Sequence, residues 1–170
     1  MVNKIKAVFC LILFFQINLA QADEIDKFFT NDRYLVAVAS RMHKFAIGQI
    51  SLKCYMMTEK LEPELNSYTE PTELRNEKYY DIAQKYTEAY FNEVEKKLGE
   101  QESNKIAMEF RNTTVQGATL WFNKINDGTA RTCSSILESV QKGDFDIDKN
   151  EQLVISINNL SKDLKIYTDN

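Results

Sequence analysis

Apolar residues recur along this chain at intervals of three and four, the spacing that places side chains on one face of an α-helix. The longest such stripe begins just after Asn31 and Asp32, either of which is expected to cap the helix. No proline interrupts it before Leu61. The pattern predicts a long first helix on which the rest of the chain packs. Its stripe consists of Leu35, Val38, Met42, Phe45, Ala46, Ile50, Cys54, Met57 and Leu61.

A polar stretch without periodicity follows, and Glu64–Glu70 is predicted to be the longest loop. The second helix is expected to start at Thr69 or Glu70, with Pro71 in its first turn, where a proline is tolerated. It is expected to end at Gly99, a residue type that commonly follows a helix C-terminus. Its apolar stripe consists of Tyr79, Ile82, Ala83, Tyr86, Ala89, Tyr90, Val94 and Leu98.

Three more helices are predicted, starting near Ser103, Thr129 and Asp148. Asp148 and Glu151 have the spacing of a capping box. The helix from Ser103 has apolar residues on two sides and is therefore expected to be central. No strand pattern or internal repeat is present, so the fold class is all-α, a bundle of about five helices. The second apolar side of the central helix comprises Met108, Val115, Leu120 and Phe122.

The chain begins with the pattern of a secretory signal peptide. Two lysines precede the unbroken apolar run Ala7–Phe15, and Ala20-Gln21-Ala22 supplies small residues for cleavage. The apolar run is shorter than the roughly 20 residues that span a membrane. We therefore expect residues 1–22 to be removed and residues 23–170 to form one periplasmic or secreted helical domain, with no attachment to a membrane.

Charge narrows the range of partners. Cleavage removes two of the 21 basic residues and none of the 25 acidic ones, so the mature chain carries 19 basic residues and a net charge of −6. Nucleic acids and anionic lipid surfaces are bound by basic patches. The acidic balance therefore disfavours both as partners.

Cys54 and Cys133 are the two cysteines that remain after cleavage. An even pair of cysteines in an oxidising compartment is expected to form a disulfide. Each lies on the apolar stripe of its own helix, so the predicted bond connects the first helix to the fourth.

Most catalytic and metal chemistry is disfavoured. His43 is the only histidine and lies beside the first stripe, so we expect it to be a partly exposed helix residue. The loop Asp144–Asn150 resembles a calcium loop, but Glu151 occupies the position of the required glycine and Ile157 that of the bidentate glutamate. No nucleophile or phosphate-binding motif occurs. We therefore expect no enzymatic activity, metal or cofactor.

Aromatic residues crowd the second predicted helix. Tyr79, Tyr86 and Tyr90 share its apolar stripe, whereas Tyr80 and Phe91 point elsewhere. Aromatic side chains outside a core are enriched at protein interfaces. Tyr79, Tyr80, Tyr90 and Phe91 are therefore the candidate protein-binding residues, and the alternative is that most of these tyrosines are core residues.

The layout of a signal peptide followed by a small acidic helical domain with one long-range disulfide resembles that of small bacterial periplasmic proteins. These include immunity proteins that neutralise exported toxins and inhibitors of cell-wall enzymes. The resemblance rests on size, export and helical class, and it implies a non-enzymatic protein that binds another exported protein. The alternative hypothesis is a carrier of a small apolar ligand or haem, built on the same bundle.

Overall fold

The computed structural model describes residues 27–58 and 63–168, and every regular element within them is helical. This confirms the all-α fold of five helices. The predicted signal peptide lies outside the described residues, and none of the described helices has the length and apolar character needed to cross a bilayer. The elements are α2 (Asn31–Met57), α3 (Pro63–Leu98), α4 (Glu100–Ile125), α5 (Ala130–Lys142), the 3-10 turn η2 (Ile147–Lys149) and α6 (Glu151–Thr168).

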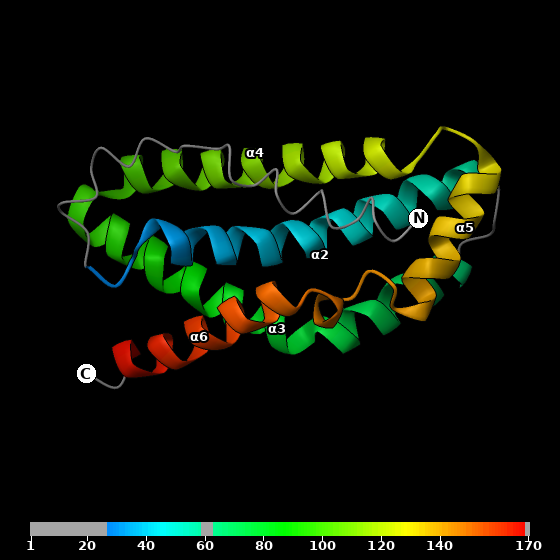
Figure 1. Ribbon diagram of the computed structural model, residues 1–170. Helices are drawn as coiled ribbons and strands as arrows, with labels where there is room; N and C mark the ends of the chain where they lie inside the picture. Colours follow the sequence, from blue (N-terminus) through cyan, green and yellow to red (C-terminus); the bar gives the residue numbers. More distant parts are fainter. Residues whose placement is uncertain (1–26, 59–62, 169–170) are drawn as a thin grey trace.

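The central helix is α2. Figure 1 shows it between α4 on one side and α3 with α6 on the other, while α5 crosses one end of the bundle. Nearly half of its residues are buried, and it contacts all four other α-helices. The prediction that α4 is central is wrong, because most of its second apolar side faces solvent: Met108 is 66% exposed and Leu120 53%, although Phe122 packs against the core.

α3 is one helix from Pro63 to Leu98, so the predicted loop and the predicted start at Thr69 or Glu70 are wrong. Pro71 lies inside the helix and not in its first turn. The buried face of α3 continues N-terminally from Tyr79 through Asn76 and Thr72, which are both fully buried. Because those two side chains are polar, a search for apolar periodicity misses this part of the face.

The starts of three other helices also differ from those predicted. α2 is capped by Thr30, whose hydroxyl oxygen accepts a hydrogen bond from Arg33 N. α4 begins at Glu100 after Gly99, which has a positive φ of 85°. α6 begins at Glu151, and it is the Asn150 side chain that accepts the hydrogen bond from Leu153 N, at 3.1 Å. Asp148 belongs to the preceding 3-10 turn and is not the cap.

The disulfide between Cys54 and Cys133 is confirmed, and it joins α2 to α5 as predicted. Both cysteines are fully buried, in an apolar cluster with Ile50, Trp121 and Leu137. α2 ends at Met57, where the backbone N–H of Thr58 bonds back to Cys54 O. The predicted end at Leu61 falls outside the described residues. The disulfide therefore holds the C-terminal end of α2 against α5, the short helix that crosses the bundle.

Candidate functional site

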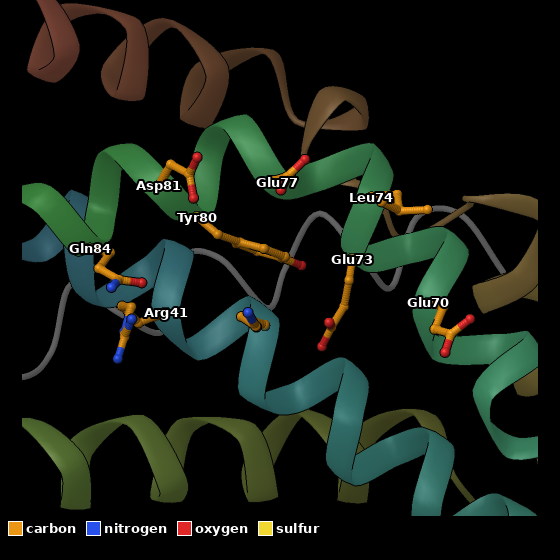
Figure 2. Close-up of a pocket in the computed structure, with 9 residues that line it drawn as sticks. Arg41, Glu70, Glu73, Leu74, Glu77, Tyr80, Asp81 and Gln84 are labelled. Atoms are coloured by element: carbon orange, nitrogen blue, oxygen red, sulfur yellow. The ribbon is translucent and has the colours of Figure 1, made fainter.

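A groove of about 400 Å³ lies between α2 and the middle of α3 (Figure 2). It is open to solvent along α3, whose side chains form most of its lining. Its polar character distinguishes it from the apolar clusters of the bundle core. The lining residues are Arg41 and Lys44 from α2, and Glu70, Glu73, Leu74, Glu77, Tyr80, Asp81 and Gln84 from α3.

Four carboxylates follow one another along the α3 side of the groove. Glu70, Glu73, Glu77 and Asp81 are spaced by three, four and four residues, and all are exposed. Within residues 27–58 and 63–168, none of the four forms an ion pair. Like charges at i,i+4 destabilise a helix by about 0.2–0.5 kcal/mol per pair. The acidic row therefore lowers the stability of α3 without a compensating ion pair in the described parts of the chain.

Two basic residues of α2 form the opposite side. The Lys44 ammonium lies 5.3 Å from the centre of the Tyr80 ring, within the range of a cation–π contact. Arg41 is half-buried, and like Lys44 it makes no ion pair within the described residues. Four carboxylates and two cations give the lining a net charge of −2. The charge is also divided, with the acids on α3 and the cations on α2.

Tyr80 connects the groove to the core through His43. The Tyr80 ring is 5% exposed, and its hydroxyl lies 2.9 Å from His43 Nδ1. His43 Nε2 lies 2.6 Å from the carbonyl oxygen of Phe145. A carbonyl oxygen only accepts hydrogen bonds, so Nε2 carries the proton and Nδ1 accepts from the tyrosine. The imidazole therefore fixes the tyrosine that forms the base of the groove.

The prediction that His43 is partly exposed is wrong, since it is only 3% exposed. Its ring stacks on Trp121 of α4, with the ring centres 6.2 Å apart. Burial lowers the pKa of His43 and raises that of Tyr80, so burial favours the neutral form of both. Because Nε2–H donates to Phe145 O and Nδ1 accepts from Tyr80, neither nitrogen is free to bind haem iron in this arrangement.

A buried polar network holds the other side of α3. Asp146, which is 6% exposed, accepts from Arg75 Nε at 2.5 Å and from Asn76 Nδ2 at 2.9 Å. The side-chain oxygen Oδ1 of Asn76 in turn accepts from Ile147 N at 2.7 Å. The Thr72 hydroxyl donates to the backbone oxygen of Val140 at 3.0 Å. These bonds fix the segment of α3 that carries the acidic row, and they occupy a carboxylate of the loop that resembled a calcium site.

The predicted protein-binding residues are mostly internal. Tyr79, Tyr80 and Tyr90 are at most 5% exposed, and Phe91 is half-buried with its ring 5.8 Å from that of Phe110. Only Tyr80 lines the groove. Tyr90 belongs to an aromatic cluster at the other end of α3, with Tyr86 and the rings that precede α2.

The acidic row was not predicted, although the sequence contains a signal for it. Glu70, Glu73, Glu77 and Asp81 have the spacing of one helix face. Glu73, Glu77 and Asp81 lie inside the second helix as predicted, but apolar periodicity does not register a row of charged residues.

The chain matches no protein-family model, no curated protein and no solved structure. Described residues also contain no group of three or more His, Cys, Asp or Glu side chains placed to hold a metal ion. The function is therefore inferred from the geometry of the groove.

Proposed function

We propose that this chain is an exported, non-enzymatic protein that binds another protein through the groove between α2 and α3. The observation that carries the proposal is the row of four exposed carboxylates beside Leu74, which is 71% exposed. Unpaired charges next to a large exposed apolar side chain offer a partner both a charged row and apolar area to cover. A bound partner supplies both the opposite charges and the apolar cover.

The scaffold behind the groove is rigid, which suits a binding surface because little ordering is needed on association. The Asp146 network fixes one side of α3, and the hydrogen bond between Tyr80 and His43 fixes the other. The disulfide adds a further constraint and is of the kind that forms in oxidising compartments. Export is supported by this bond together with the signal-peptide pattern.

Within this class we favour an immunity or inhibitor type of protein, which neutralises an exported toxin or a cell-wall hydrolase. Such a role requires only a rigid, charged surface complementary to the target.

Site-specific photo-crosslinking in living cells tests the proposal. A photo-reactive benzoylphenylalanine replaces Leu74 in one variant and Met108, on the outer face of α4, in the other. The two positions are matched in exposure, at 71% and 66%. We expect a discrete, protein-sized adduct at position 74 and none at position 108. Equal adducts at both positions, or none at position 74, would contradict binding through the groove.

A further inference from the structure

From the charges of the groove we infer the chemistry of its partner: a helix that carries a stripe of lysine or arginine residues and lies along α3. This inference rests on the proposed function and specifies what occupies the groove. It follows from three properties of the lining, namely its spacing, its division of charge and the position of its apolar side chain.

Spacing is the first property. Successive carboxylates from Glu70 to Asp81 are three or four residues apart on α3, which separates them by about 4.5–6 Å along the helix axis. Cationic side chains at i, i+4 and i+7 of a second helix repeat at the same distances. A helix laid along α3 therefore brings one cation to each carboxylate.

The division of charge is the second property. Arg41 and Lys44 face the same groove from α2, and neither has an ion-pair partner among the described residues. A partner that is basic on every side would be repelled by these two cations. The groove therefore favours a helix whose basic stripe meets α3 and whose flank toward α2 is acidic or neutral.

The third property is Leu74, which lies between the carboxylates of Glu73 and Glu77 in the sequence and is largely exposed. In Figure 2 the Glu73 side chain extends from α3 toward α2, whereas the Leu74 side chain projects away from α2. An apolar residue of the partner, placed next to its basic stripe, would cover Leu74. Charge then gives orientation and association rate, and the apolar contact adds affinity.

The test uses the mature protein and two synthetic peptides of the same composition. The segment from Glu70 to Gln84 is about 21 Å long at 1.5 Å per residue, so a helical peptide of about 15 residues covers it. The striped peptide has four lysines on one face, leucines beside them and glutamates on one flank. The scattered peptide distributes the same residues around the helix. Fluorescence anisotropy measures both affinities at several salt concentrations.

We expect saturable, salt-sensitive binding of the striped peptide and much weaker binding of the scattered one. An exposed charge pair contributes about twofold in affinity, so loss of four pairs weakens binding roughly fifteenfold. The variant E70Q/E73Q/E77Q/D81N should show this loss. The matched control E95Q/E100Q/E109Q/E138Q neutralises four exposed acids outside the groove and should change affinity less than about twofold.

Equal affinity for the two peptides, or equal weakening by the two quadruple variants, would overturn the inference, because binding would then depend on net charge alone. Circular dichroism of each variant confirms that it is folded. The crosslinking experiment distinguishes failure of the inferred partner chemistry from failure of the proposed function. An adduct at position 74 whose crosslinked segment is acidic or neutral would contradict the inference and leave the proposed function supported. Selective binding of the striped peptide with no adduct in cells would contradict the proposed function and leave the inferred chemistry of the groove supported.

Discussion

Replacement of Gly143 by alanine tests the network that supports α3 behind the groove. Gly143 ends α5 with a φ of 80°, a left-handed conformation that costs a residue with a side chain about 1–2 kcal/mol. An added Cβ would lie 2.6 Å from Asp146 Oδ2 and 3.1 Å from Arg75 Nε. These atoms belong to the salt bridge that joins α3 to the loop after α5. The substitution therefore strains the backbone and displaces a buried carboxylate from its partner.

Substitutions at two other glycines allow the backbone strain to be measured separately from the displacement of Asp146. Gly128 has a φ of 82° and no heavy atom within 4 Å of an added Cβ, so Gly128→Ala reports the backbone strain alone. Gly48 lies inside α2 with equally open surroundings, so Gly48→Ala should stabilise the protein by about 1 kcal/mol. For Gly143→Ala we expect a loss of about 3 kcal/mol. Of this, about 1–2 kcal/mol comes from weakened bonds to Asp146, a moderate figure because Arg75 is 35% exposed and partly hydrated.

The assay is equilibrium urea unfolding of the oxidised protein, followed by far-UV circular dichroism. The free energies of unfolding should decrease in the order Gly48→Ala, wild type, Gly128→Ala and Gly143→Ala. If Gly143→Ala is no less stable than Gly128→Ala, the contact of Gly143 with the Asp146 network has no energetic consequence. That result would refute a role of the Asp146 network in fixing α3.

Three further perturbations have defined outcomes. Replacing Cys54 and Cys133 by serine removes the bond across 79 residues and should lower the urea-unfolding free energy by about 4.5 kcal/mol in the chain-entropy model; a change below about 1 kcal/mol would refute it. Burial lowers the pKa of His43, so as the pH falls the unfolded state takes up the imidazole proton before the folded state does. The free energy of unfolding should therefore decrease below about pH 6.5 and stay level above it, and urea midpoints of His43→Gln should lack this decrease. The double variant Glu73→Gln and Glu77→Gln should raise the thermal midpoint slightly, since it relieves repulsion worth a few tenths of a kcal/mol; a lower midpoint would show that the acidic row stabilises α3.

Apolar periodicity was sufficient to predict five helices, because it marks which residues face the core, and the disulfide followed from the two cysteines that remain after the predicted cleavage. Cys54 and Cys133 each lay on an apolar stripe, and the structure places them in one buried cluster. The same reasoning failed for the first part of α3. There the buried face contains Thr72 and Asn76, whose polar groups are satisfied by bonds to Val140 and Ile147. Such bonds form between elements distant in sequence, so local pattern did not reveal them.

The groove was not predicted for a related reason. His43 and Tyr80 are 37 residues apart and Tyr80 was expected to point away from the core, yet they share a buried hydrogen bond. Of the acidic row, Glu73, Glu77 and Asp81 lay inside the predicted helix, and only the extension of α3 before Pro71 places Glu70 on the same face. Which helix is central also depends on packing. α4 is apolar on two sides, but the other helices bury mainly one of them.

The most direct test of the central claim is a titration of the isotope-labelled mature protein with the striped peptide, followed by amide NMR. The account predicts that shifts concentrate in α3 from Glu70 to Gln84 and around Arg41 and Lys44 of α2, and that the outer face of α4 near Met108 stays unchanged. Shifts spread evenly over the acidic surface, or concentrated on α4 or α6, would contradict the assignment of this groove as the binding site.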